Sequence, residues 1–287
     1  MDATMRPEVA FIGGTGIEVP TLFESATTVS VDTPFGPPSS PVVVGEIKGY
    51  PCAFLARHGA GHRLSPSQVP YQANIYALKT LGVRTIIAVS AVGSLRQTVR
   101  PLDIFIPDQI YDRTKSRPST FFTEMCVHVS FADPFCKDTS NALYKAGQDL
   151  GITVKSGGVY VCIEGPRFST RAESNTYRQM GFDVIGMTAM PEAILAREAE
   201  MCLGMLATVT DYDVWHDEDV TIETVMNRVS QNALNTQRII ERVVPLLFET
   251  ERTCQCEQTL RACIVTDKAC IPESEKEKLR PIIEKHV

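Results

Sequence analysis

The sequence has no long apolar run and no cluster of basic residues, and these absences exclude several classes of protein. None of its apolar stretches approaches the roughly 20 residues that a membrane-spanning helix needs. The 287 residues include 34 acidic and 28 basic side chains, for a net charge of -6. We therefore expect neither a nucleic-acid nor a membrane partner. The first residues lack the charged and apolar regions of a signal peptide, so we expect a cytoplasmic protein, with the nucleus as an alternative.

The sequence contains cysteines, but their spacing does not match a disulfide framework or a zinc-binding motif. The nine cysteines form no paired C-x-x-C arrangement and show no His spacing typical of zinc sites. We therefore expect reduced thiols and no metal site. Cys254 and Cys256 are open to interpretation as a redox or metal site. Their place in a polar C-terminal stretch instead favours a variable, exposed tail.

Short β-rich runs alternate with longer amphipathic ones, which predicts an α/β fold, a single-domain three-layer sandwich with a mixed central β-sheet flanked by helices. A turn at residues 48–51 predicts a hairpin. One domain is expected over residues 1–287, with a divergent, charged, Cys-rich segment from about residue 249 that we expect to form a charged C-terminal helix. The long connections 34–41 and 113–132 are candidates for active-site or subunit contacts. Strands are expected at 9–12, 42–47, 52–56, 85–89, 104–106, 159–163, 184–185 and 203–209, and helices at 70–81, 139–150, 170–180, 190–201 and 223–248.

Two acidic residues, separated by one position, follow the apolar run 203–209. If the run is a strand, Asp211 and Asp213 point to the same side at its carboxyl end, where open α/β sheets bind ligands. A carboxyl pair can protonate a ring nitrogen and accept a hydrogen bond from an exocyclic amine, as the base of a nucleoside requires. The alternative is a solvated acidic turn.

Candidate anion-binding groups follow several other predicted strands. The turn Gly13-Gly14-Thr15-Gly16 matches neither the dinucleotide nor the P-loop motif, but small residues let backbone N–H groups approach an anion. Arg57 and His58 are expected to grip an oxyanion, the Arg bidentately and the His through a ring N–H. Residues 90–94 add hydroxyl and amide donors at a turn, and Thr188 lies near a helix N-terminus, where it could equally be a structural cap.

An anion site and an acid pair with a sugar-sized gap between them suit phosphorolysis of an N-glycosidic bond. Cleavage builds positive charge at C1' and negative charge on the base, which phosphate and a proton at N7 respectively stabilise. Asp211 is the expected general acid, with a pKa raised by burial beside a second acid. Asp213 is the expected acceptor for a 6-amino group. Phe168 is a candidate for stacking on the base, or else a core aromatic.

The chain resembles the trimeric purine nucleoside phosphorylase family, in its methylthioadenosine branch, over nearly its whole length to about residue 248. The residues that carry the resemblance are Gly13-Gly14-Thr15-Gly16, Val31-Asp32-Thr33-Pro34-Phe35-Gly36, Ala56-Arg57-His58-Gly59, Tyr71-Gln72-Ala73-Asn74-Ile75, Gly93-Ser94-Leu95-Arg96, Ile163-Glu164-Gly165-Pro166-Arg167-Phe168-Ser169, Met187-Thr188, Pro191-Glu192 and Thr210-Asp211-Tyr212-Asp213.

The resemblance implies a pentosyltransferase that converts 5'-methylthioadenosine and phosphate to adenine and 5-methylthioribose 1-phosphate, in purine and methionine salvage, with adenosine and 2'-deoxyadenosine as further substrates. It implies a homotrimer, no metal and no cofactor, with inorganic phosphate as co-substrate. The implied phosphate site is Thr15, Arg57, His58, Ser90, Ala91 and Thr188. The implied nucleoside site is Phe168, Ser169, Met187, Asp211, Asp213, Ile222, Val225, Met226 and His128 of a neighbouring subunit.

The chain departs from the family pattern in places. Gly186 stands where the methylthioadenosine branch usually has Asn, Ser90 replaces a usual Thr, and the Cys-rich tail matches poorly. Ile222, Val225 and Met226 recur at helical spacing after the turn 217–219, so the core is an alternative place for them. The other activities that remain open are a broader purine nucleoside phosphorylase, a nucleosidase that activates water, and a non-catalytic nucleoside-binding trimer.

Overall fold

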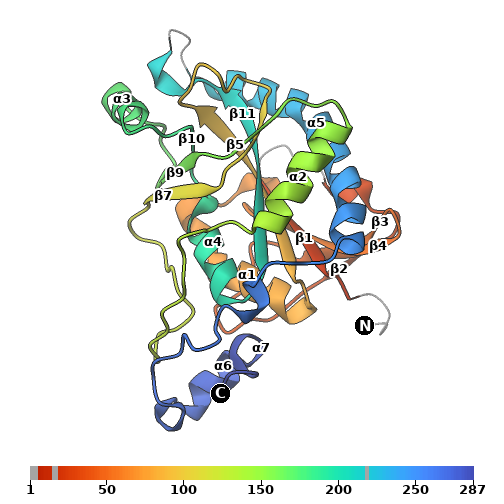
Figure 1. Cartoon of the computed structure of the whole chain (residues 1–287), viewed down its shortest axis with the longest axis vertical. Helices are drawn as coiled ribbons and strands as arrows, with labels where there is room; N and C mark the ends of the chain where they lie inside the picture. Colours follow the sequence, from red (N-terminus) through yellow and green to blue (C-terminus); the bar gives the residue numbers. More distant parts are fainter. Residues whose placement is uncertain (1–5, 15–18, 217–219) are drawn as a thin grey trace.

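One mixed β-sheet runs through the molecule in the computed structural model, which describes residues 6–14, 19–216 and 220–287. Figure 1 shows the sheet between two groups of helices. Parallel pairs (β1 with β4, β1 with β5, β5 with β11) and antiparallel pairs (β2 with β3, β3 with β4) occur together, which confirms the mixed sheet. The strands are β1 Val9–Gly13, β2 Ala26–Val29, β3 Val42–Ile47, β4 Tyr50–Ala56, β5 Thr85–Ser94, β6 Ile104–Ile106, β7 Gln109–Arg113, β8 Val154–Ser156, β9 Val159–Ile163, β10 Val184–Gly186 and β11 Cys202–Asp211.

Helices cover both faces of the sheet. The helices are α1 Tyr71–Leu81, α2 Lys137–Asp149, α3 Arg171–Gln179, α4 Ala189–Glu198, α5 Ile222–Glu249, α6 Glu273–Lys278 and α7 Arg280–Ile283. One apolar core joins α1 and α4 to the sheet, and a second joins α2 and α5 to its opposite face. Side chains along β5 point alternately to the two faces of the sheet. Ile86 and Ala88 pack in the first core, and Ile87 and Val89 pack in the second. No helix among the described residues is both long and apolar enough to cross a bilayer.

The central strand β5 has a gap in its pairing that creates space for a site. On one edge it pairs with β11 along nearly its whole length. On the other edge β1 pairs with residues 85–88, while β10 pairs only with Gly93 and Ser94. Between these two partners, residues 89–92 have no strand beside them on this edge in the described part of the chain. The sheet therefore opens in its middle.

Most predicted elements are confirmed, and the differences have physical causes. The hairpin turns through Lys48 and Gly49, both with positive φ. α1 ends at Gly82, whose left-handed φ of 99° closes the helix. β5 continues five residues beyond the predicted 85–89, so residues 90–94 are strand and not the predicted turn. Pairing with β11 sustains this extension despite the small and polar residues. The short strands β2, β7 and β8 were not predicted.

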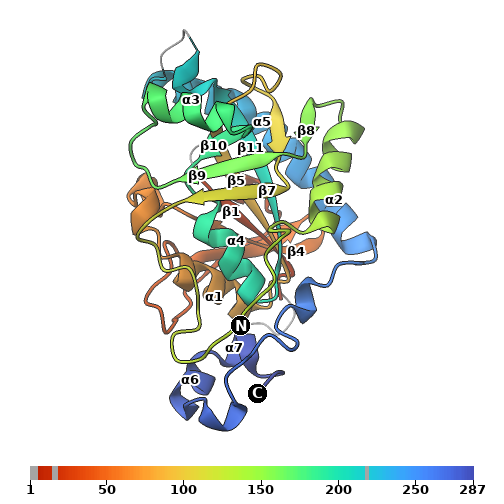
Figure 2. The ribbon, with the colours of Figure 1, turned by 60° about the vertical axis from the view of Figure 1, so that its left-hand side comes forward.

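The C-terminal segment, residues 250–287, folds as irregular chain followed by α6 and α7 and not as one charged helix. Figure 2 shows it at the end of the molecule opposite α3. Leu279, Ile282 and Ile283 are buried in the core that contains α1, and Val127 bridges to Ile264. The segment is thus attached to the main sheet layer by side chains. The predicted single domain over residues 1–287 stays a prediction.

Candidate functional site

A cavity of about 630 Å³ lies at the gap in the sheet. Its walls include Gly14 after β1, residues 90–93 of β5, and Ile185 and Gly186 of β10. The cavity brings together these predicted site residues: Arg57, His58, Ser90, Ala91, Phe168, Ser169, Met187, Thr188, Asp211, Asp213, Ile222, Val225 and Met226. Sequence reasoning missed lining residues from the loop after β4, namely His62, Arg63, Leu64, Ser65, Pro66 and Gln68. These residues come soon after Arg57 and His58 in the sequence, and this proximity is the one signal that could have indicated them.

Arg57 is held by a protein carboxylate, which corrects the predicted bidentate grip on an oxyanion. The Arg57 Nε and Nη2 atoms donate to Glu192 at 2.5 and 2.9 Å. Nη1 donates to the carbonyl of Val89 at 2.9 Å, and Nη2 also reaches that of Ile12 at 3.4 Å. Four of the five guanidinium N–H groups are thereby engaged. The fifth lies on Nη1, the atom closest to Gly14, where an added Cβ would meet it at 3.1 Å.

His58 is neutral, and its ring N–H donates to a protein carbonyl instead of to an oxyanion as predicted. Its Nδ1 lies 2.8 Å from the carbonyl of Leu64 and must carry the proton in that contact. Burial, with the adjacent charge of Arg57, lowers the pKa of His58 to about 4. The ring is therefore neutral near pH 7, and its Nε2 carries a lone pair.

Two hydroxyl groups meet at the gap beside β5. Ser90 Oγ and Thr188 Oγ1 are 3.2 Å apart, and both residues are buried. Thr188 occupies the N-cap position of α4, yet its side chain makes no capping hydrogen bond. The hydroxyl points instead toward Ser90. This arrangement favours the anion-binding interpretation of Thr188 over a purely structural cap.

The predicted acid pair forms one buried unit at the end of β11. Asp211 accepts hydrogen bonds from the Thr210 hydroxyl and from the backbone N–H of Asp213, both at 2.7 Å. Burial raises the pKa of Asp211 to about 6 and raises that of Asp213 as well. Gly93 makes room for the pair, because a Cβ there would lie 2.8 Å from Asp211 Oδ1. The solvated turn is thereby excluded.

Two polar atoms of the cavity lack protein partners. Asp213 Oδ2 and Ser169 Oγ are both buried, and neither has a hydrogen-bond partner among the described residues. Buried polar atoms are costly to leave unpaired, and both atoms belong to residues that line the cavity. One is an acceptor and the other can donate or accept.

Exposed apolar side chains surround the rest of the cavity. Phe168 is 41% exposed, Met226 is 40% exposed and Ile222 is 68% exposed, although all three are apolar. The core interpretation is therefore wrong for these residues. The buried face of α5 begins only at Val229. An apolar ligand surface would cover side chains that water now contacts.

Gly186 is explained by its neighbour Tyr160. A Cβ at residue 186 would lie 1.9 Å from the Tyr160 hydroxyl oxygen, so the larger side chain usual at this position has no room. The same hydroxyl lies 3.5 Å from Ser90 Oγ and accepts from the Thr188 N–H at 3.4 Å. Tyr160 thus supports the hydroxyl pair from behind. No local pattern in the sequence indicates this role.

Arg117 is a further residue that sequence reasoning missed. It lies in the long connection 113–132, is buried, and donates through Nη1 to the carbonyls of Met187 and Met190 at 2.7 and 2.6 Å. Its Nη2 donates to the carbonyl of Glu164 at 2.5 Å. Arg117 therefore fixes the backbone on two sides of the cavity.

Two predicted site residues remain, Thr15 and His128. Thr15 lies outside the described residues. His128 is exposed, and its backbone N–H donates to the carbonyl of Cys263 at 3.0 Å, within the contact between residues 126–128 and the C-terminal segment. It does not line the cavity of its own chain. Its predicted place in a neighbouring subunit stays a prediction.

The cavity, with its hydroxyl pair, acid pair and apolar rim, agrees with the family that sequence comparison identifies. A sequence profile of the Phosphorylase superfamily matches residues 8–245, and the chain belongs to this superfamily. The chain is 49% identical to an S-methyl-5'-thioadenosine phosphorylase of Koribacter versatilis over 98% of this chain and 97% of that protein. It is 47% identical to the protein of the same name in Thermofilum pendens, over 91% and 99% of the two chains.

Solved structures of two methylthioadenosine phosphorylases are also similar to this chain. A methylthioadenosine phosphorylase sourced from an Antarctic soil metagenomic library superimposes with a TM-score of 0.92 at 46% identity, covering 96% of this chain and 98% of that one. Methylthioadenosine phosphorylase from Schistosoma mansoni in complex with adenine superimposes with a TM-score of 0.85 at 34% identity, over 92% and 97%. These likenesses confirm the predicted α/β fold with a mixed sheet between helices.

Proposed function

We propose that this protein is a pentosyltransferase that cleaves 5'-methylthioadenosine with inorganic phosphate, giving adenine and 5-methylthioribose 1-phosphate in purine and methionine salvage. Adenosine and 2'-deoxyadenosine are further substrates under the same proposal. The observation that carries it is the placement of a buried acid pair and a buried hydroxyl pair on the walls of one cavity. The names of relatives at 44–50% identity support the substrate.

The reaction breaks the bond between C1' and N9 and forms a bond between C1' and a phosphate oxygen. Asp211 delivers a proton to N7 of the departing base, which relieves the charge left by the breaking bond. Its raised pKa keeps a usable fraction of the carboxyl protonated near neutral pH. Hydrogen phosphate releases one proton when it becomes the sugar phosphate, and this proton balances the one given to adenine.

In this proposal, phosphate lies between Thr15, the free N–H of Arg57, His58, Ser90, Ala91 and Thr188. The Ser90 and Thr188 hydroxyls donate to it. The neutral His58 accepts from a hydroxyl of phosphate through Nε2, since its Nδ1 is committed to Leu64. A site that accepts as well as donates matches hydrogen phosphate better than a fully ionised anion. No cofactor takes part.

Adenine binds between the acid pair and Phe168. The Asp213 carboxylate accepts from the 6-amino group, and Ser169 supplies a second polar contact; both residues line the cavity. Phe168 stacks on the base and Met187 packs on the ribose. Ile222, Val225 and Met226 cover the methylthio group, with His128 of a neighbouring subunit in a homotrimer.

Adenine release from methylthioadenosine, with and without phosphate, tests the function, with the sugar product identified by mass spectrometry. We expect release only with phosphate, and methylthioribose 1-phosphate as product. Release without phosphate that gives free methylthioribose would identify a nucleosidase. Binding of the nucleoside without release would identify the non-catalytic alternative, and a faster reaction with inosine would identify a broader purine nucleoside phosphorylase.

Sedimentation and subunit mixing test the trimer separately. A His128→Ala chain mixed with an Asp211→Asn chain should regain activity, because one active site in a mixed trimer then has both side chains intact. An active monomer in sedimentation would refute the shared site while leaving the phosphorylase proposal in place.

A further inference from the structure

Four cysteines that are distant in the sequence come together away from the cavity. Their Sγ atoms all lie within 4.8 Å of one another: Cys136, Cys202, Cys254 and Cys256. Cys136 precedes α2, Cys202 begins β11, and the other two come from the irregular chain after α5. Cys256 is buried and Cys254 is half-buried. The predicted exposed tail is therefore wrong for this pair, and the ligands come together only in the fold.

The arrangement has the size of a tetrahedral thiolate site. Zinc–sulfur bonds of about 2.3 Å place the sulfurs of a tetrahedron about 3.8 Å apart. Cys202 Sγ and Cys254 Sγ are 3.4 Å apart, and no pair exceeds 4.8 Å. Each sulfur is near all three others, as in a four-ligand cage. Such a closed shell of four protein ligands leaves no open position and is typical of structural zinc.

We propose that Cys136, Cys202, Cys254 and Cys256 bind one zinc ion, which fastens the C-terminal segment to α2 and β11. This site lies outside the cavity and takes no part in the proposed reaction.

Groups around the cluster favour negatively charged sulfur and hold the ligands in place. Arg252 Nη2 donates to Cys202 Sγ at 3.2 Å and to Thr85 Oγ1 at 2.8 Å. Cys136 occupies the N-cap position of α2, where the helix dipole stabilises a thiolate. Asp138 accepts from the backbone N–H groups of Thr253 and Cys254 at 2.7 and 2.8 Å. The ligand loop is thus positioned by hydrogen bonds of its own, as second-shell contacts of metal sites commonly are.

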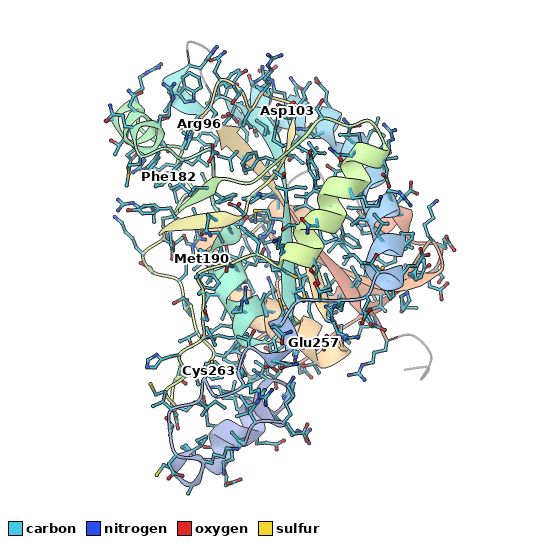
Figure 3. The ribbon with its side chains drawn as sticks, in the orientation of Figure 1. Arg96, Asp103, Phe182, Met190, Glu257 and Cys263 are labelled. Carbon is cyan, nitrogen blue, oxygen red and sulfur yellow. The ribbon has the colours of Figure 1, made fainter. Side chains whose placement is uncertain are left out.

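The site has a structural consequence for the C-terminal segment. Figure 3 places Glu257, just after the cluster, and Cys263 in the lower part of the molecule, away from Arg96. Beyond the cluster, the segment contacts residues 126–128 through backbone hydrogen bonds, from His128 to Cys263 at 3.0 Å and from Val265 to Cys126 at 2.9 Å. A metal ion at the cluster holds the start of the C-terminal segment in place, and the contacts with residues 126–128 come after that point in the chain.

Metal analysis of the full chain tests the proposal. The protein is purified without a metal-binding tag under reducing conditions, incubated with zinc chloride, freed of excess metal and analysed by plasma mass spectrometry. We expect about one zinc per chain in the native protein and almost none in a C254S/C256S variant. A C263S/C270S variant is the matched control, because it removes two thiols of the same segment that lie outside the cluster. It should keep its zinc.

A chelator experiment on the unmodified protein covers the case in which the variant folds poorly. Stripping zinc with a chelator should lower Tm by at least about 5 °C and open residues 250–260 to limited proteolysis, and zinc chloride alone should reverse both effects. Protein without zinc, protein that retains iron instead, or peptide mapping that finds these cysteines in disulfides would each overturn the proposal.

Discussion

Arg57 and Glu192 form a two-point ion pair in which both side chains are shut off from water. Their side chains are 1% and 0% exposed, and the two nitrogen–oxygen distances are 2.5 and 2.9 Å. The pair joins the loop that follows β4, which also carries His58, to α4, whose N-cap is Thr188. Pairing with Glu192 holds the guanidinium in one orientation and leaves one N–H for a ligand. Glu192 therefore acts on phosphate through Arg57 and is a positioning residue.

Glu192→Ala should destabilise the protein by about 3–5 kcal/mol, because it leaves a buried guanidinium without its counter-charge. Glu192→Gln should cost less and raise KM for phosphate about tenfold, because a neutral amide holds the guanidinium less firmly. Urea unfolding and phosphate kinetics measure the two effects. Glu241→Ala is the control, since its pair with Lys48 is exposed and is worth at most about 1 kcal/mol. Equal destabilisation by both Ala variants would contradict the assignment.

Asp211→Asn should reduce kcat at least about a hundredfold, the usual scale of general-acid catalysis. The acid acts in its protonated form, and its pKa is about 6 in the fold. Native kcat/KM should therefore fall as pH rises above 6, by up to about tenfold per pH unit. Phosphate also titrates in this range, but it does so equally for the variant. A pH profile of the variant that keeps the native slope would remove Asp211 from the role.

Asp213→Asn should damage cleavage of adenine nucleosides more than cleavage of inosine. The carboxylate can only accept a hydrogen bond, which suits a 6-amino group, whereas an amide can also donate to a 6-oxo group. The ratio of kcat/KM values for adenosine and inosine should move toward inosine by at least about tenfold. Equal losses on the two substrates would mean that Asp213 does not contact position 6.

Gly186→Asn should destabilise the protein by about 1–3 kcal/mol, because the new side chain displaces Tyr160. Adding Tyr160→Leu to this variant should recover part of the loss, and a double-mutant cycle by thermal unfolding measures the coupling. Additive effects would show that the two positions do not compete for one space. Tyr160→Phe alone should raise KM for phosphate, since it removes the hydroxyl beside Ser90 and Thr188.

The local sequence pattern was sufficient to predict elements whose start, end and periodicity are determined by neighbouring residues. The strands at Val9 and Ile104, and the helix stop at Gly82, depend on apolar periodicity and on one residue able to adopt positive φ. The extension of β5 through Ser94 depends on β11, which is more than a hundred residues away, so no local signal could indicate it.

The same distinction between local and distant residues explains which parts of the site were predicted. The acid pair was found because Asp211 and Asp213 are separated by a single residue and follow a strand. The role of Arg57 was only partly correct, because Glu192 lies 135 positions away and occupies the two nitrogens that were expected to bind an anion. The four-cysteine cluster was missed for a similar reason, since three separate segments supply its sulfurs.

Ile222→His should shift substrate preference from methylthioadenosine toward adenosine. Ile222 begins α5 at the rim of the cavity, 68% exposed, and under the proposed function it contacts the 5' substituent. An apolar pocket discriminates between a methylthio group and a hydroxyl by only about 1–3 kcal/mol, whereas an imidazole offers the hydroxyl a hydrogen bond. The kcat/KM ratio should therefore change by about tenfold, equivalent to about 1.4 kcal/mol.

Leu234→His provides the matched control for this change. Leu234 lies on the same helix and is 69% exposed, but it does not line the cavity. Both substitutions remove an exposed apolar side chain from α5 and add the same imidazole, so their effects on stability should be similar and small. Only the Ile222 variant should change the ratio of adenosine to methylthioadenosine, measured by adenine release from each nucleoside. The same ratio in the Ile222 variant as in the native protein would mean that α5 begins too far from the bound nucleoside to select its 5' group, because the control accounts for any general effect of the histidine.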